Sequence, residues 1–287
     1  MPRQGIDYAW HHSLNLDAFR THGVTFVVRY LSNDESKNLD ASEAHLLSDG
    51  GFDLVVVWET TAQRALDGRA AGATDAKKAA AQAKACGMPA RRPIYFGVDF
   101  DAQDHDLPKI ANYLRGAASV IGEKRVGVYG GIRVVKHCLD HSVARFGWQT
   151  YAWSHNQRDP RAHLYQHHNG VVIGAVNCDL DTAYHADFGQ WRRRVAKAPP
   201  FPYAAGDYLG TARPDRHCHS GADPIERQSI AKWQKKMADR GWRIEATGVF
   251  NRQSARVCRS FQVEKGLSVD GLVHPGTWAK TWTAPVT

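Results

Sequence analysis

The chain has 287 residues, of which 43% are hydrophobic and 23% are charged, a composition typical of one large folded domain or of a large and a small one. Its longest apolar stretches, such as Leu54–Trp58, are far shorter than the roughly 20 residues of a membrane-spanning helix, so we expect no membrane insertion. The net charge is +8, and the lack of a zinc-finger motif, an RNP motif or an uninterrupted basic run disfavours a nucleic-acid partner.

Eight strand-like runs recur along the first two thirds of the chain, with helix-like sequence between them. The clearest helical stretches are Asp75–Cys86 and Leu107–Ile121, each followed by glycine. Alternating strands and helices predict a parallel (β/α)8 TIM-like barrel over residues 1–195. An open doubly wound sheet is the alternative, but no glycine-rich nucleotide-binding motif is present, so we expect no cofactor. The runs are Ile6–Trp10, Phe26–Leu31, Leu54–Glu59, Pro93–Asp99, Arg125–Gly130, Gln149–Trp153, His163–His167 and Val176–Asp181.

The sequence changes character after Trp191. Residues 196–222 are rich in Pro, Gly and His and read as a linker. In residues 223–287, apolar side chains such as Ile230, Trp233 and Met237 recur at helical spacing, which predicts a small all-α domain of three helices. Residues 196–287 carry 14 Lys and Arg against 8 Asp and Glu, whereas residues 1–195 carry 23 against 21. The basic excess is suited to an anionic partner such as a cell wall.

Carboxylates stand in or at the ends of four strand-like runs, where the loops of a barrel converge. Side chains two residues apart in a strand share a face, so Asp99 with Asp101, and Asp179 with Asp181, are predicted to point into one cavity. Crowded carboxylates raise one another's pKa and provide a protonated acid beside ionised neighbours, as glycoside hydrolysis requires. Any one aspartate could instead cap a helix. The carboxylates are Asp7, Glu59, Asp99, Asp101, Asp179 and Asp181.

Aromatic residues lie near the ends of the same runs. Trp10, Trp58, Tyr129 and Trp153 follow or close the first, third, fifth and sixth runs. They could stack on the apolar face of a sugar ring or pack in the core.

Several of these runs carry a family resemblance. Gly5-Ile6-Asp7, the segment Tyr95–Asp101, the segment Val126–Gly130, Leu164-Tyr165-Gln166 and the segment Val176–Asp181 resemble the glycoside-hydrolase-like barrels related to the family 25 lysozymes. The resemblance covers about residues 3–191 and implies cleavage of the β-1,4 bond between N-acetylmuramic acid and N-acetylglucosamine in peptidoglycan. Gln166, which belongs to one of these motifs, is expected to contact the substrate. The same is expected, from their positions at or near the ends of the runs, of Trp10, Glu59, Tyr129, Trp153 and Asp181.

The same resemblance implies catalytic roles for four aspartates. The fourth-strand motif of family 25 is Asp-x-Glu, whose glutamate is the proton donor, so Asp101 takes that position here and Asp99 the supporting one. Asp7 and Asp179 complete the acidic site. Because aspartate is one methylene shorter than glutamate, Glu59 is the alternative donor.

The C-terminal segment resembles the peptidoglycan-binding domains. The matching residues include Trp233-Gln234, Gly248–Asn251, Phe261-Gln262, Gly266–Gly271 and Thr277-Trp278. The resemblance implies a three-helix wall anchor in which Trp233, Gln234 and Trp278 are either core residues or glycan contacts.

These features together favour a peptidoglycan hydrolase of the phage endolysin type, monomeric, with cell-wall glycan as its partner. One rival is a zinc-dependent amidase, for which histidines such as His11, His12, His163, His167 and His168 would supply ligands, although no His-Glu-x-x-His motif occurs. The other rival is a non-catalytic wall-binding protein with a degenerate barrel.

The five cysteines are widely spaced and never form Cys-x-x-Cys, so we expect reduced thiols. His217-Cys218-His219 lacks a second ligand pair, and we expect no metal site. The chain begins in strand-like sequence without the pattern of a signal peptide. We therefore expect synthesis in the cytoplasm and release to the wall by another route, such as a holin.

Overall fold

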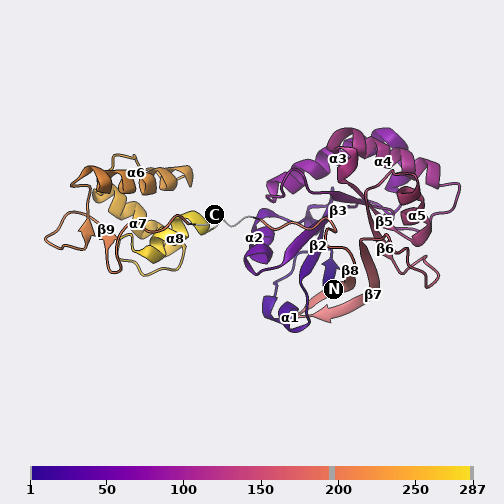
Figure 1. Cartoon of the computed structure of the whole chain (residues 1–287), viewed down its shortest axis with the longest axis horizontal. Helices are drawn as coiled ribbons and strands as arrows, with labels where there is room; N and C mark the ends of the chain where they lie inside the picture. Colours follow the sequence, from indigo (N-terminus) through magenta and orange to yellow (C-terminus); the bar gives the residue numbers. More distant parts are fainter. Residues whose placement is uncertain (1, 194–197, 285–287) are drawn as a thin grey trace. The chain divides into compact units, whose positions relative to one another are not determined.

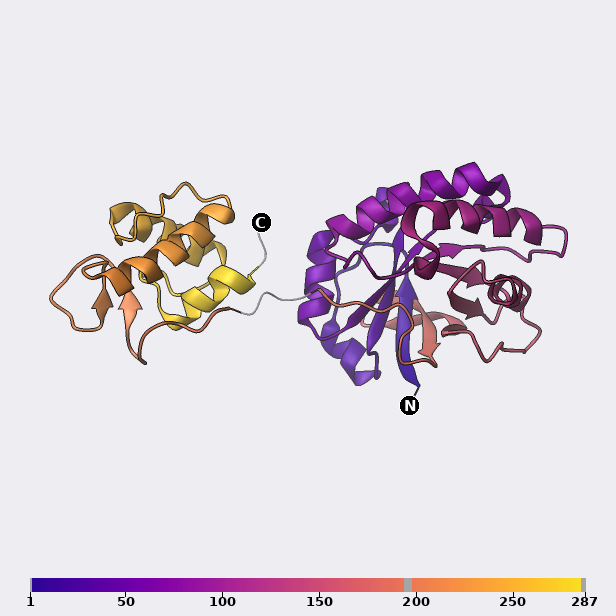
Figure 2. The ribbon, with the colours of Figure 1, turned by 45° about the horizontal axis from the view of Figure 1, so that its top comes forward.

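The computed structural model describes residues 2–193 and 198–284, which belong to two compact units divided between residues 194 and 195. The first unit is a closed barrel of eight strands with helices on its outside (Figure 1 and Figure 2). The predicted TIM-like barrel is thereby confirmed, and the open sheet is excluded. No helix of the described residues is long and apolar enough to cross a membrane.

The strands follow one another around the barrel in chain order. They are β1 (Arg3–Tyr8), β2 (Phe26–Leu31), β3 (Asp53–Trp58), β4 (Ile94–Gly97), β5 (Val126–Gly130), β6 (Phe146–Thr150), β7 (Leu164–Ile173) and β8 (Val176–Ala183). The helices are α1 (Leu16–Thr21), α2 (Ala41–Asp49), α3 (Gly68–Ala85), α4 (Leu107–Ile121) and α5 (Ile132–Asp140), and each follows the strand of the same number.

The last three strands depart from the expected alternation of strands and helices. No α-helix stands between β6 and β7, and β7 joins β8 through a tight turn at Gly174-Ala175, where both residues have positive φ. As a result β8 runs antiparallel to both β7 and β1. The sixth strand also lies three residues earlier than expected, and Trp153 adopts a left-handed conformation in the loop that follows it.

Inward and outward side chains alternate along the strands. In β2, Phe26 and Val28 point into the barrel, whereas Val27 and Leu31 pack against the helices. A methyl group on Gly5 would lie 2.3 Å from the ring of Phe26, so glycine is needed there to admit the aromatic side chain. Large side chains therefore fill the barrel interior, and the polar residues gather at one end of it.

A buried ion pair ties β2 to α2 outside the barrel. The guanidinium group of Arg29 contacts both carboxylate oxygens of Glu43, at 2.6 and 3.0 Å, and Tyr8 donates a hydrogen bond to the same carboxylate. The remaining Arg29 nitrogen donates to the carbonyl oxygens of Tyr8, Ala9 and Lys37. One side chain thus holds the segments that leave β1 and β2.

The second unit contains the predicted three helices and two short parallel strands. The elements are β9 (Tyr208–Leu209), β10 (Cys218–His219), α6 (Pro224–Asp239), α7 (Arg252–Glu264) and α8 (Pro275–Thr283). Trp233, Gln234 and Trp278 are all buried in its core. The amide group of Gln234 bonds the backbone of Gly248 and Val249, which fixes the loop before α7.

Much of the segment expected as a linker is folded onto this second unit. Phe201 and Tyr203 pack against its core, and the carbonyl oxygen of Pro199 accepts a hydrogen bond from the Trp278 indole. Leu209 is fully buried. The folded part of the unit therefore begins near residue 199 rather than 223, and residues 196 and 197 lie outside the described residues.

We predict that Glu43→Ala lowers the free energy of unfolding of the barrel by about 3 to 5 kcal/mol, because Arg29 would be left charged, buried and unpaired. Urea unfolding followed by circular dichroism measures this change. Asp17→Ala, which breaks the exposed Asp17–Arg20 pair, is the matched control and should leave stability nearly unchanged. Equal losses in the two variants would contradict the role given to the Arg29–Glu43 pair.

Candidate active site

Three carboxyl groups meet where β1 pairs with β8. Asp7 lies near the end of β1, and the antiparallel register places Asp179 directly opposite it. Asp181, two residues further along β8, pairs with Gly5 and lies deeper in the barrel. The predicted shared face of Asp179 and Asp181 is therefore present, although β8 runs in the opposite direction from the one expected.

A single amide group links the two paired aspartates. Gln166 Nε2 donates to Asp7 Oδ2 and to Asp179 Oδ2, each at 2.9 Å. Gln166 Oε1 accepts a hydrogen bond from the Tyr129 hydroxyl at 2.8 Å, and the Tyr30 hydroxyl donates to Asp7 Oδ1 at 3.1 Å. Gln166 and Tyr129 thus hold the carboxyl groups in place, and their hydrogen-bonding groups are engaged within the protein.

Asp181 is the most deeply buried carboxyl group of the three. Burial, followed by the negative charge of Asp7, raises its pKa well above the ordinary value. The Trp148 indole donates to Asp181 Oδ1 at 2.8 Å, whereas no donor among the described residues reaches the buried Oδ2. The interaction between the Asp181 and Asp7 side chains raises the pKa of Asp181 further and lowers the pKa of Asp7.

Asp7 still titrates near neutrality. Burial is the main cause that raises its pKa to about 7, and the negative charge of Asp179 adds to it. Hydrogen bonds from Gln166 and Tyr30 favour the ionised form but do not offset burial. Near pH 7 this carboxyl group is therefore present in both its protonated and its ionised form.

Glu59 is the second carboxyl group with a pKa near 7. It follows β3 directly, and 15% of its side chain is exposed. Burial and then the negative charge of Asp99 raise its pKa to about 7, against the opposing effect of Lys37, whose Nζ lies 3.9 Å from Oε1. A side chain on Gly97 would lie about 3.3 Å from Glu59 Cγ, so glycine at the end of β4 leaves space for this glutamate.

Asp99 and Asp101 differ in their surroundings. Because β4 ends at Gly97, both lie in the following loop, where the alternation of a strand no longer applies. Asp99 is half-buried beside Glu59, and burial raises its pKa. The Asp101 side chain is exposed and forms no hydrogen bond or ion pair with the described residues. The structure thus brings Asp7, Glu59, Asp99, Asp179 and Asp181 together but leaves Asp101 outside this acidic cluster.

The aromatic candidates divide between surface and core. Trp10 is 56% exposed and lies under the Lys37 ammonium group, 5.8 Å from ring centroid to Nζ. Trp153 is half-buried in the loop after β6. Trp58 points outward from β3 and is buried against the helices, so it packs in the core. Trp10 and Trp153 therefore remain available to a ligand, whereas Trp58 does not.

Three residues of the site were not recognised in the sequence. Tyr30 and Trp148 looked like ordinary apolar core positions, although each occupies an inward position of its strand. Lys37 lies in a short 3-10 helix, far from any recognisable motif. The inward alternation of β2 could have revealed Tyr30, but the misplaced start of β6 concealed Trp148.

The histidines do not assemble into a metal centre in the described part of the chain. No group of three or more His, Cys, Asp or Glu side chains in residues 2–193 and 198–284 is arranged to hold a metal ion. His163 stands before β7, whereas His11 and His12 follow β1. The spacing that a zinc-dependent amidase needs is not formed by these residues.

Comparisons with known proteins place the barrel among related domains. The family described as Rv2525c-like, glycoside hydrolase-like domain matches residues 17–184. Rv2525c of Mycobacterium tuberculosis, named as a candidate peptidoglycan hydrolase, is 30% identical over 192 residues, which cover 60% of this chain and 77% of that protein. The crystal structure of Tat-secreted Rv2525c with L-tartrate has a TM-score of 0.62 at 27% identity and covers 66% of this chain and 98% of that structure.

A more distant structure shares the fold alone. The modular autolysin LytC from Streptococcus pneumoniae has a TM-score of 0.50 at 17% identity, over 64% of this chain and 47% of that one. The family match lies within the part of the chain that forms the barrel.

We predict that the barrel loses stability as the pH rises from about 4 to about 7. The folded protein holds the Asp7 proton with a pKa of about 7, whereas the unfolded chain releases it near 3.8, so this contribution is fully present below pH 4 and is lost through pH 7. In Asp7→Asn, the decrease in the free energy of unfolding between pH 4 and pH 7 should be smaller by on the order of 3 kcal/mol. Urea unfolding at several pH values across this range measures it. Asp17→Asn, at an exposed position, should leave the slope unchanged. The same slope in wild type and Asp7→Asn would argue against a protonated Asp7.

Proposed function

Since this chain belongs to the Rv2525c-like, glycoside hydrolase-like domain family, we propose that it is a peptidoglycan hydrolase that cleaves β-1,4 glycosidic bonds as muramidases do. The proposal is supported by the related Rv2525c protein and, above all, by one observation. A glutamic acid with a pKa of about 7 lies beside aspartates at the same end of the barrel. This arrangement matches the requirement of glycoside hydrolysis for one acid and one ionised carboxylate.

Glu59 is the proton donor in this proposal. At pH 7 Glu59 is protonated in about half of the protein molecules. The proton passes to the glycosidic oxygen as the bond to the anomeric carbon breaks. Asp99 keeps the pKa of Glu59 high, because its charge opposes ionisation of the neighbouring group. Asp101, the position implied by family resemblance, is exposed and lies outside the acidic cluster.

The other acidic groups stabilise the transition state. As the leaving group departs, positive charge develops at the anomeric carbon and ring oxygen. Asp99 and Asp179, both half-buried, provide negative charge at the same end of the barrel, and Gln166 fixes Asp179 in position. Water then adds to the anomeric carbon, and an ionised carboxylate accepts its proton. Trp10 and Trp153 are the aromatic surfaces on which sugar rings can stack.

The second unit serves in this proposal as a wall anchor. Its basic excess favours an anionic wall, and a tethered anchor raises the concentration of substrate at the barrel. Because Trp233, Gln234 and Trp278 are buried, glycan contacts must come from other residues of the unit. Action on the wall as an endolysin, after synthesis in the cytoplasm, is part of the same proposal.

We predict that Glu59→Gln lowers kcat/KM for peptidoglycan by about 10²- to 10⁴-fold, because the amide cannot donate the catalytic proton. Asp101→Asn is the matched control at the exposed position and should retain most of the activity. Mass spectrometry of digested walls measures new reducing-end muramic acid. Loss of activity in Asp101→Asn alone would reverse the assignment of the donor. Free stem peptides would indicate an amidase, and wall binding without new reducing ends would indicate a non-catalytic barrel.

We predict that kcat/KM of the wild type falls as the pH rises through about 7. Glu59 is active when protonated, so the active fraction decreases above its pKa. The measurement is the initial rate of reducing-end release between pH 5 and 9 at constant ionic strength. A rate that is constant across pH 7 would rule out Glu59 as the acid that limits the reaction.

A further inference from the structure

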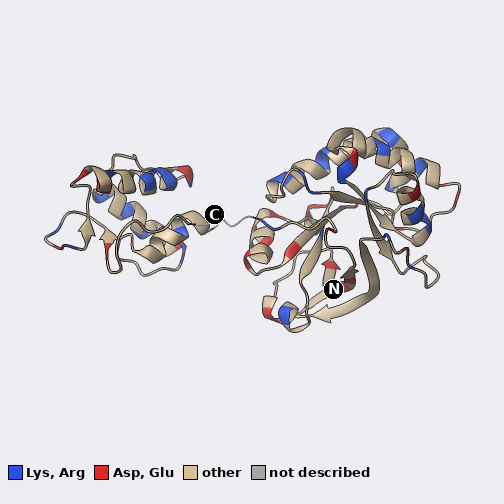
Figure 3. Ribbon diagram, in the orientation of Figure 1, with Lys and Arg blue, Asp and Glu red and all other residues tan. Residues whose placement is uncertain are grey.

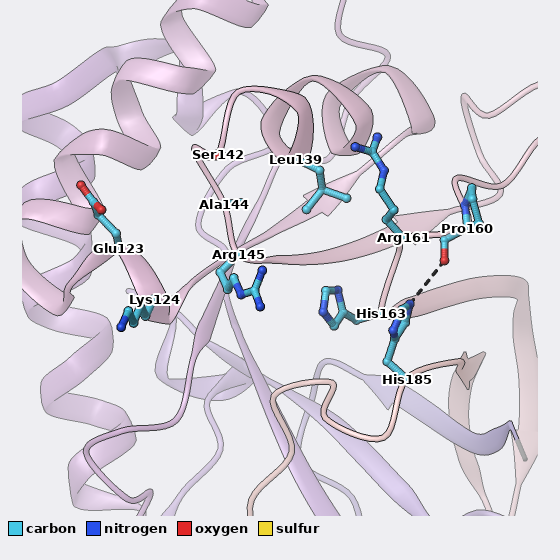
Figure 4. Close-up of a pocket in the computed structure, with 10 residues that line it drawn as sticks. All are labelled: Glu123, Lys124, Leu139, Ser142, Ala144, Arg145, Pro160, Arg161, His163 and His185. Atoms are coloured by element: carbon cyan, nitrogen blue, oxygen red, sulfur yellow. Dashed lines mark hydrogen bonds between the residues drawn. The ribbon is translucent and has the colours of Figure 1, made fainter.

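A hollow lies at the end of the barrel opposite the acidic cluster. Its volume is about 590 Å³, and its walls come from the segments that precede β5, β6 and β7 and from the segment that follows β8 (Figure 4). The acidic cluster stands on β1 and β8 and directly after β3 and β4, at the other end of the barrel. The hollow is therefore separate from the candidate active site.

Cationic groups dominate the walls of this hollow. Arg145, Lys124 and Arg161 line it, and Figure 4 shows Arg145 next to His163, with Lys124 and Arg161 on opposite sides. Arg161 is already paired with Asp140 and Asp159. Within residues 2–193 and 198–284, neither Lys124 nor Arg145 forms an ion pair. Two positive charges are thus free to bind an anion.

The neighbouring acidic groups do not neutralise these charges. Asp187, whose negative charge raises the pKa of His163, forms an ion pair with Arg92. Glu123 is the one carboxylate on the lining, and in Figure 4 its side chain points away from Arg145. The hollow therefore keeps an excess of positive charge.

His163 adds a neutral hydrogen-bond donor. The backbone N–H of Gly147 donates to His163 Nδ1 at 3.2 Å, which places the hydrogen of the neutral ring on Nε2. Burial, together with the charges of His185 and Arg145, lowers the pKa of His163 to about 4, so the ring stays neutral at pH 7. Guanidinium, ammonium and imidazole N–H groups together are suited to the oxygens of a phosphate.

A second hollow adjoins the first. Its volume is about 470 Å³, it shares Glu123 and Ser142 with the first, and it is lined by Arg69, Arg115 and His141. In Figure 3 lysines and arginines mark α3 and α4, the helices that carry Arg69 and Arg115. Two adjoining cationic hollows fit a ligand with repeated negative charges better than a single small ion.

We infer that the two hollows bind phosphate diester groups of an anionic polymer of the cell wall. Phosphate is favoured because arginine presents paired N–H groups to its oxygens. The lining of both hollows contains no Phe, Tyr or Trp on which a nucleobase could stack, which argues against single-stranded nucleic acid. The choice of a wall polymer rests on the proposed function, whereas the phosphate site itself does not.

The test uses the full chain and a synthetic poly(glycerol phosphate) in isothermal titration calorimetry. The double variant Lys124→Ala/Arg145→Ala should weaken binding about tenfold or more, because two charge-assisted contacts are lost. Lys77→Ala/Lys109→Ala removes the same charge from exposed positions of α3 and α4 and is the matched control. Equal weakening in both double variants, or none in either, would overturn the site.

Three competitors identify the ligand. Poly-L-glutamate of matched charge should compete poorly if phosphate is recognised, and equal competition would overturn the choice of phosphate. Inorganic phosphate should compete only at a far higher concentration than the polymer. If free phosphate competes as well as the polymer at the same concentration of phosphate groups, the choice of a polymer is overturned. Tighter binding of a DNA oligonucleotide through Lys124 and Arg145 would overturn the choice of a wall polymer.

Failure of the proposed phosphate site can be distinguished from failure of the proposed hydrolysis. Cleavage of purified glycan free of phosphate polymer should be the same in Lys124→Ala/Arg145→Ala as in wild type, because the hollows and the acidic cluster lie at opposite ends of the barrel. Hydrolysis of intact, phosphate-bearing walls should be slower in this variant. If no glycan is cleaved at all, the calorimetric binding measurement still tests the phosphate site.

Discussion

The antiparallel pairing of β8 with β1 is the constraint on which the candidate site depends. It places Asp179 directly opposite Asp7, so that one amide group, that of Gln166, donates to both carboxyl groups. Burial, followed by repulsion between the carboxylates, raises the pKa of Asp7 to about 7 and the pKa of Asp181 well above its ordinary value. Neutral acid and ionised acid therefore coexist within one cluster, which is the electrostatic condition for acid-catalysed cleavage of a glycoside.

Strand alternation alone predicted much of this site. It assigned Asp179 and Asp181 to one cavity, and this held although β8 runs opposite to the expected direction, because alternation is the same in both directions. Asp7 was predicted from its place in the first run and from the family resemblance. Alternation did not predict the position of Asp101, because alternation applies only within a strand and β4 ends at Gly97, four residues earlier. The sequence also did not reveal Arg29 and Glu43 as partners, since that pair forms only when α2 packs on the barrel.

Composition was a poor guide to the boundary of the second unit. The Pro-, Gly- and His-rich stretch that reads as a linker contains Tyr208–Leu209 and Cys218–His219, which form two short strands. The three helices were predictable from apolar spacing, and the buried tryptophans confirm the core interpretation. The role of Gln234 was not predictable, because a glutamine that bonds loop backbone has the same appearance in a sequence as one that binds a ligand.

Gly97 has a consequence for how such sites diversify. With no side chain at the end of β4, the glutamate on the neighbouring strand can occupy the space that a larger residue would fill. On the proposal that Glu59 donates the proton, the chemical role that family 25 lysozymes assign to the fourth strand has migrated to the third without any change of scaffold. The size of the residue at position 97 therefore affects how much room a carboxyl group on the neighbouring strand has at this end of the barrel.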